Sequence, residues 1–142
     1  MFDFSGFRCK KLHPDAILPH KEDGDAGYDM HSVEAVTIPS GTLRTIKLGF
    51  SAELPYATYC QLKDRSSMAS KGLVIYAGVM DPSYRGEWKV LMHNISRWNV
   101  GIGRGDKVCQ GVIRRFANPV PSWVDELTET GRGEGGFGST GK

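Results

Sequence analysis

The final twelve residues, 131–142, have a composition suited to closing over a nucleotide rather than to forming a core. Six of them are glycine, so the segment loses much conformational entropy when it becomes ordered, and a ligand would have to offset that loss. Phe137 can stack on a base. The side chains that can donate to phosphate oxygens are those of Arg132, Ser139 and Thr140. The alternative is an unstructured Gly/Ser-type tail.

A hairpin predicted over residues 76–90 places a carboxylate at its bend. An apolar arm leads into Asp81 and Pro82, and a second strand follows, so a pocket between the arms would offer backbone donors and acceptors to a flat polar ring. Gly78 permits close approach. Asp81 can take a proton from water if it faces the phosphates. The simpler interpretation is that Asp81 begins a type I turn before Pro82.

Two further positions can contact phosphate. Arg65 precedes a short helix expected over residues 66–72, with Ser66 as its N-cap and Gly72 as its C-terminal stop. The helix amides and the guanidinium together make an anion site. Gln110, which follows a tight turn, can donate its amide to a phosphate, although it also fits as an ordinary strand residue.

Asp29 is a lone acid that enters an apolar strand. Such an acid is costly unless it is paired or turned toward a metal. A single aspartate suits Mg²⁺, which usually keeps several waters and takes further ligands from substrate phosphates.

The elements that must position these groups have the pattern of short β strands. Apolar residues alternate with polar ones at residues 46–54 and 58–62, and further apolar runs lie at 33–38, 88–92 and 108–113. Turn-forming residues separate the runs. Many short strands at this spacing predict an all-β sandwich or barrel.

Length and composition allow one domain with a core. The 142 residues are 39% hydrophobic, so we expect a single β domain over residues 1–130 and a mobile glycine-rich arm over residues 131–142. Eighteen basic and sixteen acidic residues give a net charge of +2 without a run of like charge, which argues against duplex nucleic acid as a partner. Small buried apolar residues or free thiols, rather than disulfides or a zinc site, are predicted at Cys9, Cys60 and Cys109.

Neither a membrane partner nor secretion is expected. No stretch approaches the roughly 20 apolar residues of a membrane span, and the first residues lack the features of a secretory signal. The expected location is the cytoplasm, with a nuclear or viral setting left open.

Taken in chain order, these segments resemble the motifs of the trimeric dUTPase family. The five matching motifs span nearly the whole chain and lie at residues 26–32, 65–71, 77–90, 104–113 and 132–141. The third and fifth are the most specific. Their order favours a nucleotide-binding role for the tail over an unstructured terminus.

The resemblance implies an all-β, jelly-roll-like barrel or sandwich with one short helix and a flexible C-terminal tail, assembled as a homotrimer whose active sites combine motifs of different subunits. It implies hydrolysis of dUTP to dUMP and pyrophosphate, which limits uracil incorporation into DNA and supplies dUMP for dTMP synthesis. Asp81 would activate the water that attacks the α-phosphate, and Asp29 would hold Mg²⁺ through water.

The resemblance also implies which residues contact the nucleotide. Tyr84 would pack against the deoxyribose, and Phe137 would stack on uracil. Hydrogen bonds to uracil would come from the backbone of Gly78, Val79, Met80 and Asp81 and from the strand near Lys89. The phosphates would be bound by Arg65, Ser66, Ser67, Gln110, Arg132, Gly138, Ser139 and Thr140.

Residues 64–68 depart from the family pattern. Many relatives carry Pro-Arg-Ser-Gly-Leu where this chain has Asp-Arg-Ser-Ser-Met. Asp64 would either weaken triphosphate affinity or pair with Arg65, and Ser67 puts a Cβ where the backbone should approach phosphate. These departures leave a second function open, that of a catalytically weak jelly-roll binding or regulatory module. The related dCTP deaminases share the fold, but no matching deamination motif is present.

Overall fold

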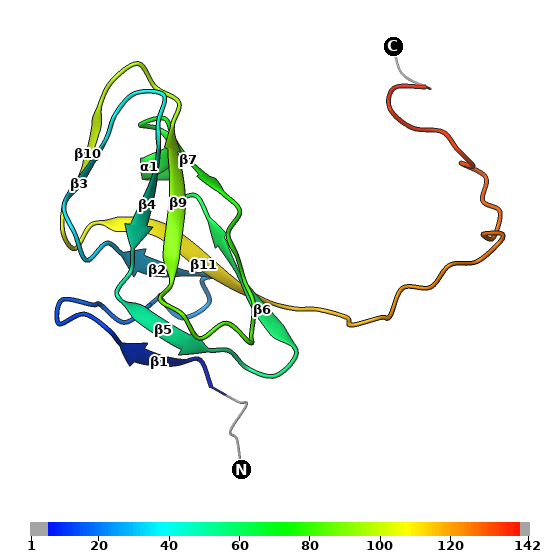
Figure 1. The fold of residues 1–142 in the computed structure, drawn as a ribbon, viewed down its shortest axis with the longest axis horizontal. Helices are drawn as coiled ribbons and strands as arrows, with labels where there is room; N and C mark the ends of the chain where they lie inside the picture. The colour runs from blue at the N-terminus through cyan, green and yellow to red at the C-terminus, as the bar shows by residue number, and fades with distance from the viewer. Residues whose placement is uncertain (1–5, 140–142) are drawn as a thin grey trace.

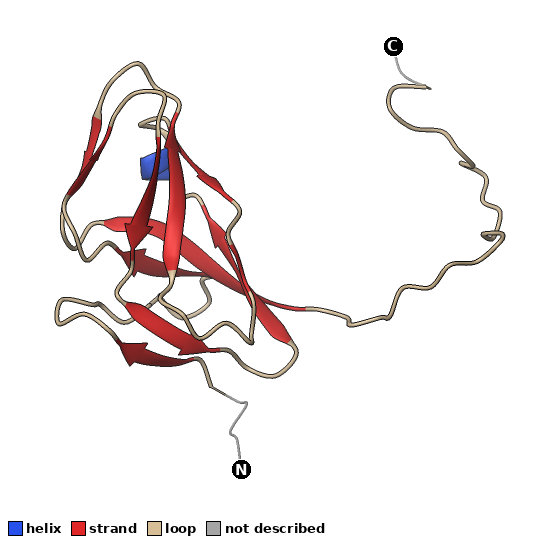
Figure 2. Ribbon diagram, viewed as in Figure 1, coloured by secondary structure: helices blue, strands red, loops and turns tan. Residues whose placement is uncertain are grey.

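The alternating apolar pattern forms short antiparallel strands in the computed structural model, which describes residues 6–139 (Figures 1 and 2). The strands are β1 Arg8–Lys11, β2 Gly27–His31, β3 Val36–Ile38, β4 Leu43–Lys47, β5 Phe50–Glu53, β6 Thr58–Lys63, β7 Leu73–Tyr76, β8 Val79–Met80, β9 Lys89–Asn94, β10 Val100–Ile102 and β11 Lys107–Arg115. A short helix, α1 Ser66–Ala69, lies between β6 and β7. Thr140, which we predicted to bind phosphate, lies outside the described residues.

Strands that are far apart in sequence pair with one another. The largest sheet has the order β2–β11–β6–β8, and a three-stranded sheet has the order β4–β9–β7. The pairs β1–β5 and β10–β3 complete the fold, and all pairings are antiparallel. Long-range antiparallel pairing around one apolar core is typical of jelly rolls and barrels. The predicted all-β, jelly-roll-like fold with one short helix is confirmed.

The apolar residues predicted at 46–54 are buried, but they serve two strands rather than one. Gly49, with a positive φ of 77°, redirects the chain between β4 and β5. A Cβ at Gly49 would lie 2.5 Å from Cγ1 of Val33, so glycine is required there. The buried members of the pattern are Ile46, Leu48, Phe50, Ala52 and Leu54.

Trp88 anchors the chain where it enters β9. Its side chain is fully buried, and its ring lies 5.7 Å from that of Phe7 and 5.3 Å from that of Phe50 between centroids. The backbone N–H of Trp88 donates to the carbonyl of Phe50 at 2.8 Å. The long loop before β9 is therefore fixed at its end by packing against the core.

The helix α1 begins at Ser66, one residue earlier than a cap at Ser66 would give. Arg65 is the N-cap, with extended angles of φ −92° and ψ 142°, and its side chain makes no capping hydrogen bond. The prediction of Ser66 as N-cap is wrong, because Ser66 is already the first helical residue. The predicted end at Gly72 is also wrong, because α1 ends at Ala69 with Ser70 as its C-cap; Gly72, with a positive φ of 84°, follows two residues later.

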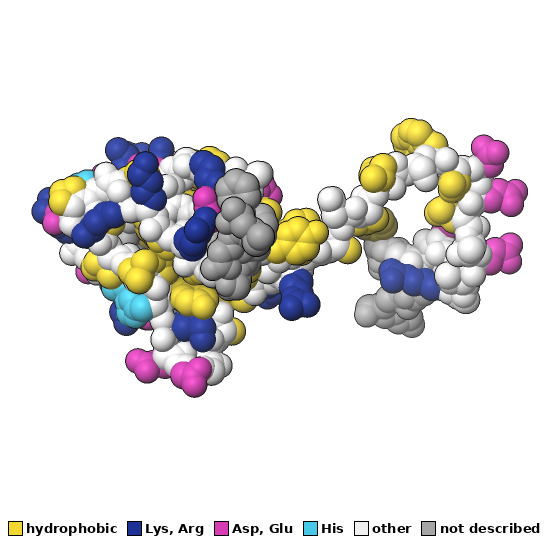
Figure 3. Space-filling model, turned by 90° about the horizontal axis from the view of Figure 1, so that it is seen from below, with side chains coloured by type: hydrophobic (Ala, Val, Ile, Leu, Met, Phe, Trp, Pro, Cys, Tyr) yellow, Lys and Arg dark blue, Asp and Glu magenta, His cyan; other side chains and the backbone are white. Residues whose placement is uncertain are grey.

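The chain after β11 runs away from the sheets as an extended segment (Figure 1). Residues 116–139 contain no helix or strand, and in Figure 3 they stand apart from the domain, with apolar and acidic side chains spread along them. The exposed large apolar side chains of this segment are those of Phe116, Val120, Trp123, Val124, Leu127 and Phe137. The division into a domain at 1–130 and a mobile arm at 131–142 stays a prediction.

Within residues 6–139, no helix is long and apolar enough to cross a membrane.

Candidate active site

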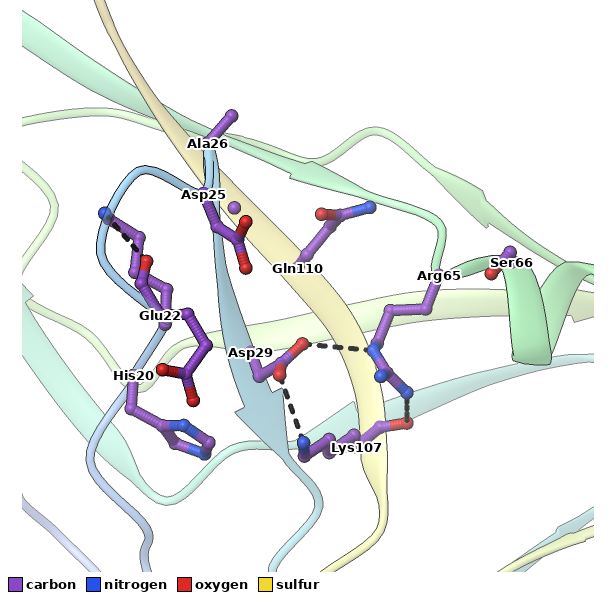
Figure 4. A pocket seen from close by; sticks show the side chains of 11 residues that line it. His20, Glu22, Asp25, Ala26, Asp29, Arg65, Ser66, Lys107 and Gln110 are labelled. Atoms are coloured by element: carbon purple, nitrogen blue, oxygen red, sulfur yellow. Dashed lines mark hydrogen bonds and ion pairs between the residues drawn. The ribbon is translucent and has the colours of Figure 1, made fainter.

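A pocket of about 460 Å³ collects four of the predicted site residues, Asp29, Arg65, Ser66 and Gln110 (Figure 4). It lies where β2, β11 and the corner between β6 and α1 meet. The sheet order makes this possible, because β11 pairs with both β2 and β6. The other lining residues are His20, Lys21, Glu22, Asp25, Ala26, Gly27 and Lys107. We refer to it as the phosphate pocket, after the prediction that four of its residues bind phosphate or its metal ion.

One carboxylate in the phosphate pocket holds two cations. Oδ1 of Asp29 lies 3.1 Å from Nε of Arg65, and Oδ2 lies 3.2 Å from Nζ of Lys107. Partial burial raises the pKa of Asp29, but the hydrogen bond from Lys107 and the charge of Arg65 outweigh that effect, so the pKa lies below its ordinary value. The carboxylate is therefore ionised at neutral pH and is paired with both cations.

Arg65 also makes contacts within its own corner. Its Nη1 donates to Oγ of Ser67 at 3.2 Å and to the carbonyl of Lys107 at 3.5 Å. Among the described ion pairs, Arg65 is joined to Asp29 and not to Asp64. Ser67 therefore orients the guanidinium, although it does not line the pocket.

Gln110 is fixed by the main chain rather than pointing freely into the pocket. Its Nε2 donates to the carbonyl of Asp64 at 2.9 Å, and its backbone lies opposite Asp29 in the β11–β2 register. A Cβ on Gly27 would lie only 2.2 Å from Oε1 of Gln110, so glycine makes room for the amide. The amide nitrogen carries a second N–H, which is the one a phosphate could use.

The predicted hairpin residues gather around a second pocket of about 290 Å³. We call it the nucleoside pocket, after the prediction that these residues contact the base and the sugar. It is formed by the end of β7, β8, the loop after β8 and the start of β9. The predicted residues that line it are Gly78, Val79, Met80, Asp81, Tyr84 and Lys89, and the further ones are Tyr76, Ala77, Glu87 and Leu91.

The incoming arm of the predicted hairpin is divided between two sheets. Strand β7 pairs with β9, with Tyr76 opposite Leu91, whereas β8 pairs with β6, with Met80 opposite Cys60. The connection is therefore a wide loop instead of the tight bend that we expected. The backbone N–H of Tyr84 donates to the carbonyl of Asp81 at 3.1 Å, so the turn interpretation of Asp81 also describes its backbone.

Gly78 brings the loop against β6. Its carbonyl accepts a hydrogen bond of 2.7 Å from the N–H of Leu62, and its φ is 95°. A Cβ at this position would lie 2.8 Å from the carbonyl oxygen of Leu62. Glycine is thus required both by the backbone angle and by the close approach.

The hydroxyl group of Tyr84 is fixed by the main chain of the same loop. Its hydroxyl donates to the carbonyl of Glu87 at 3.0 Å, and a Cβ on Gly86 would lie 2.3 Å from that hydroxyl oxygen. With its polar end tied to the main chain, the partly exposed ring presents a fixed apolar surface to the nucleoside pocket.

A single chain does not bring the three parts of the predicted site together. The phosphate and nucleoside pockets share no lining residue. The tail makes short internal contacts instead: Nε of Arg132 donates to the carbonyl of Gly135 at 2.6 Å, and the N–H of Gly136 donates to Oγ of Ser139 at 2.8 Å. The side chain of Phe137 is fully exposed.

Sequence reasoning missed several pocket residues. Lys107 lies inside the fourth motif but was not assigned a role. In the β11–β2 register it lies opposite His31, two residues from Asp29, and its Nζ reaches the Asp29 carboxylate. His20 belongs to an irregular loop with no motif, and it reaches the pocket beside His31, with 2.8 Å between their Nε2 atoms. Tyr76 looked like an ordinary strand residue.

The donor set fits a metal ion only in part. Among the described residues, no group of three or more His, Cys, Asp or Glu side chains is placed to hold a metal. Asp29 is engaged by two cations, yet a carboxylate has further lone pairs that can accept from water. This arrangement fits an ion held mainly by waters and by the phosphates of a ligand.

One pocket is lined by three basic and three acidic side chains, and a second is lined by glycine and a fixed aromatic ring. Polar pockets of this kind on a jelly-roll framework indicate a nucleotide-binding class of protein.

Comparison with known proteins gives the family. The dUTPase family model matches residues 14–141. The chain is 39% identical to the deoxyuridine 5'-triphosphate nucleotidohydrolase of Paramecium bursaria Chlorella virus 1, over 96% of this chain and 99% of that protein. It is 38% identical to the enzyme of the same name from Clostridioides difficile, over 94% and 96%. The chain belongs to the dUTPase family, which confirms the resemblance of its motifs.

The fold agrees with that assignment. The dUTPase of Staphylococcus bacteriophage 80alpha, solved with dUPNHPP, matches with a TM-score of 0.90 at 26% identity, over 97% of this chain and 99% of that one.

Proposed function

We propose that this chain hydrolyses dUTP to dUMP and pyrophosphate. The observation that carries the proposal is the nucleoside pocket, in which Asp81, the Gly78 backbone and the Tyr84 ring line one cavity. A pyrimidine can hydrogen-bond to backbone groups that glycine leaves accessible, and a sugar can pack on the ring. Mismatched donors and acceptors would reject cytosine strongly, whereas the thymine methyl and a 2′-hydroxyl would be excluded by steric fit.

Asp81 is the proposed general base. It would accept a proton from a water molecule whose oxygen attacks the α-phosphorus, while the bond from that phosphorus to the bridging oxygen of the β-phosphate breaks and pyrophosphate leaves. Its position at the end of β8, in the same cavity as the proposed base and sugar contacts, supports this role.

The triphosphate is proposed to lie in the phosphate pocket. Arg65, Ser66 and the second amide N–H of Gln110 supply donors there, and Ser67 supports Arg65. Asp29 would hold Mg²⁺ through water, as its remaining lone pairs permit. Mg²⁺, when bound with the substrate, neutralises charge on the phosphate oxygens.

We infer that the complete site forms between copies in a homotrimer. The two pockets are separate in one chain, and the extended segment carries exposed apolar side chains at Val120, Trp123 and Leu127 that a second copy would cover. A nucleoside pocket of one copy would then face the phosphate pocket of another.

The tail is proposed to close over the bound nucleotide. Phe137 would stack on uracil, and Arg132, Gly138, Ser139 and Thr140 would contact the phosphates. Closure would exclude bulk water and position the γ-phosphate. Because many glycines lose entropy on ordering, closure would remain reversible and compatible with turnover.

A pyrophosphate-release assay with dUTP, dCTP, dTTP and UTP tests the function. We expect rapid release from dUTP and at least about a hundredfold lower kcat/KM for each of the other three. Silence on all four nucleotides would contradict the proposal and would favour a binding module.

A further inference from the structure

Asp64 ties three strands together at the corner between β6 and α1. Its Oδ1 accepts a hydrogen bond of 2.9 Å from the backbone N–H of Ile75 in β7. Its carbonyl accepts one of 2.9 Å from Nε2 of Gln110 in β11. Strands β6 and β11 belong to the four-stranded sheet, whereas β7 belongs to the three-stranded sheet. The carboxylate therefore links the two sheets immediately beside the phosphate pocket.

Arg65 is the next residue, and its carbonyl accepts hydrogen bonds from the N–H groups of Met68, at 3.0 Å, and Ala69, at 2.9 Å. The helix that it precedes has four residues, and Arg65 makes no side-chain capping bond to it. A helix this short has little stability of its own. The guanidinium must nevertheless reach Asp29 on β2, at 3.1 Å, and Ser67 in α1, at 3.2 Å. The hydrogen bonds of Asp64 fix the backbone next to Arg65 and so the position of the Arg65 Cα atom.

We propose that Asp64 is a positioning residue for Arg65. By anchoring the corner to β7, its carboxylate keeps the guanidinium aligned with Asp29 and directed into the phosphate pocket. Asp64 thus acts through the hydrogen bond to Ile75 rather than through its charge. The kinetic test of this inference rests on the proposed function, because it measures dUTP hydrolysis. The binding test requires only that the phosphate pocket binds a polyphosphate.

An effect of the negative charge would have the opposite sign. If repulsion between Asp64 and the phosphates governed affinity, removing the charge would tighten binding in both Asp64→Asn and Asp64→Ala. If the hydrogen bond governs it, Asp64→Asn keeps an oxygen acceptor and should resemble the unchanged chain. Asp64→Ala leaves the Ile75 N–H without this acceptor and should bind more weakly.

Steady-state kinetics on the full chain separate these cases. We expect Asp64→Ala to raise the KM for dUTP about tenfold and to change kcat by less than about twofold. A displaced Arg65 guanidinium would lose one charge-assisted hydrogen bond to a phosphate oxygen, and the loss of one such bond corresponds to about a factor of ten in binding. Asp64→Asn should stay within about twofold of the unchanged chain in both constants. General destabilisation would lower the active fraction, and so the apparent kcat, without moving KM.

Two further variants complete the comparison of Asp64→Ala with Asp64→Asn: a matched control and a replacement in case Asp64→Ala does not fold. Glu34 also uses a side-chain oxygen to accept a backbone N–H, that of Lys47 in β4, at 3.4 Å, but it lines neither pocket. Glu34→Ala should leave KM unchanged. If Asp64→Ala does not fold, Asp64→Ser replaces it, because the serine hydroxyl is one bond shorter than the carboxylate arm and should fall short of Ile75.

Calorimetric titration with inorganic tripolyphosphate gives a readout that needs no turnover. Asp64→Ala should weaken its binding about tenfold and Asp64→Asn should not, with Arg65→Ala as the reference for complete loss. If the unchanged chain does not hydrolyse dUTP but shows this binding pattern, the proposed function fails and the positioning role stands. Unchanged or tighter binding by Asp64→Ala, or no binding by the unchanged chain, overturns the inference.

Discussion

Arg65 and Asp29 form an ion pair that joins the α1 corner to strand β2, with 3.1 Å between Nε and Oδ1. The other carboxylate oxygen, Oδ2, lies 3.2 Å from Nζ of Lys107 on β11 (Figure 4). One carboxylate therefore orients two cationic side chains from different elements. The phosphate pocket is also lined by Lys21, Glu22 and Asp25, so its basic and acidic side chains are equal in number. The two ion pairs with Asp29 fix the direction in which Arg65 and Lys107 present their remaining donors.

The stabilising effect of Asp29 should depend on pH in a defined direction. Its pKa in the folded chain lies below the ordinary value of 3.8, so its contribution is fully present above pH 3.8 and is lost as the pH falls through the lower folded value. The difference in unfolding free energy between the unchanged chain and Asp29→Asn should be constant from about pH 5 to 8 and shrink in more acidic buffer. Urea titrations at several pH values measure it. A difference that grows on acidification would contradict the pairing.

Gly78→Ala should damage both stability and the nucleoside pocket. Gly78 has a positive φ of 95°, and the added Cβ would lie 2.8 Å from the Leu62 carbonyl oxygen, so we expect a loss of about 2 kcal/mol or more in unfolding free energy. Gly41→Ala is the matched control, because Gly41 has a φ of 74° and no atom within 4 Å of where its Cβ would lie. Urea denaturation should show the larger loss for Gly78→Ala. Equal losses would mean that close packing at Leu62 is unimportant.

Removing residues 131–142 should lower turnover but leave the free energy of unfolding almost unchanged. The described part of this arm packs on neither pocket, and Phe137 is fully exposed, so the unfolding free energy should change by less than about 0.5 kcal/mol. Turnover should fall about a hundredfold, because closure over the nucleotide would be lost. Phe137→Ala within the full arm tests whether the ring supplies much of that effect. Full activity of the truncated chain would show that the arm takes no part.

The three thiols should react slowly in the native protein. Burial raises the pKa of Cys9 to about 11 and those of Cys60 and Cys109 to about 12. At pH 8 less than about one thiol in a thousand would be ionised, so iodoacetamide should label the folded chain at least about a hundredfold more slowly than the urea-unfolded chain. Mass spectrometry follows the modification. Fast labelling of Cys60 or Cys109 under native conditions would contradict their burial.

Mixed trimers test whether active sites form between copies. Asp81→Asn and Arg65→Ala should each be nearly inactive alone, since each lacks one half of every site. After unfolding and refolding together in equal amounts, about a quarter of the sites would combine an intact Asp81 from one chain with an intact Arg65 from another. Activity should therefore return to about that fraction. No recovery, despite a trimeric mass in solution, would place both residues of a site in one chain.

The sequence predicted best what local pattern controls. Alternation located the strands, and the hairpin motif named most residues of the nucleoside pocket, because those residues are consecutive or nearly so. The departure of β8 to pair with β6 could not be seen, since it depends on a partner strand that lies at residues 58–63.

The phosphate pocket shows the same limit more clearly. Asp29 was identified as a lone acid entering an apolar strand, and Arg65 as a cation before a short helix. Their pairing, and that of Asp29 with Lys107, depends on the order β2–β11–β6. The two expectations for Asp64 both considered only its charge. Its hydrogen bond to Ile75 joins two sheets, a relationship that no local pattern encodes.

The most direct test of the central claim is the replacement of the carboxylate at residue 81. Asp81→Asn keeps the shape of the side chain but cannot serve as a general base, so pyrophosphate release from dUTP should fall by about a thousandfold. Calorimetry with a non-hydrolysable dUTP analogue should give a dissociation constant within about twofold of the unchanged chain. Turnover within about tenfold of the unchanged chain would contradict the assignment of Asp81 as the base.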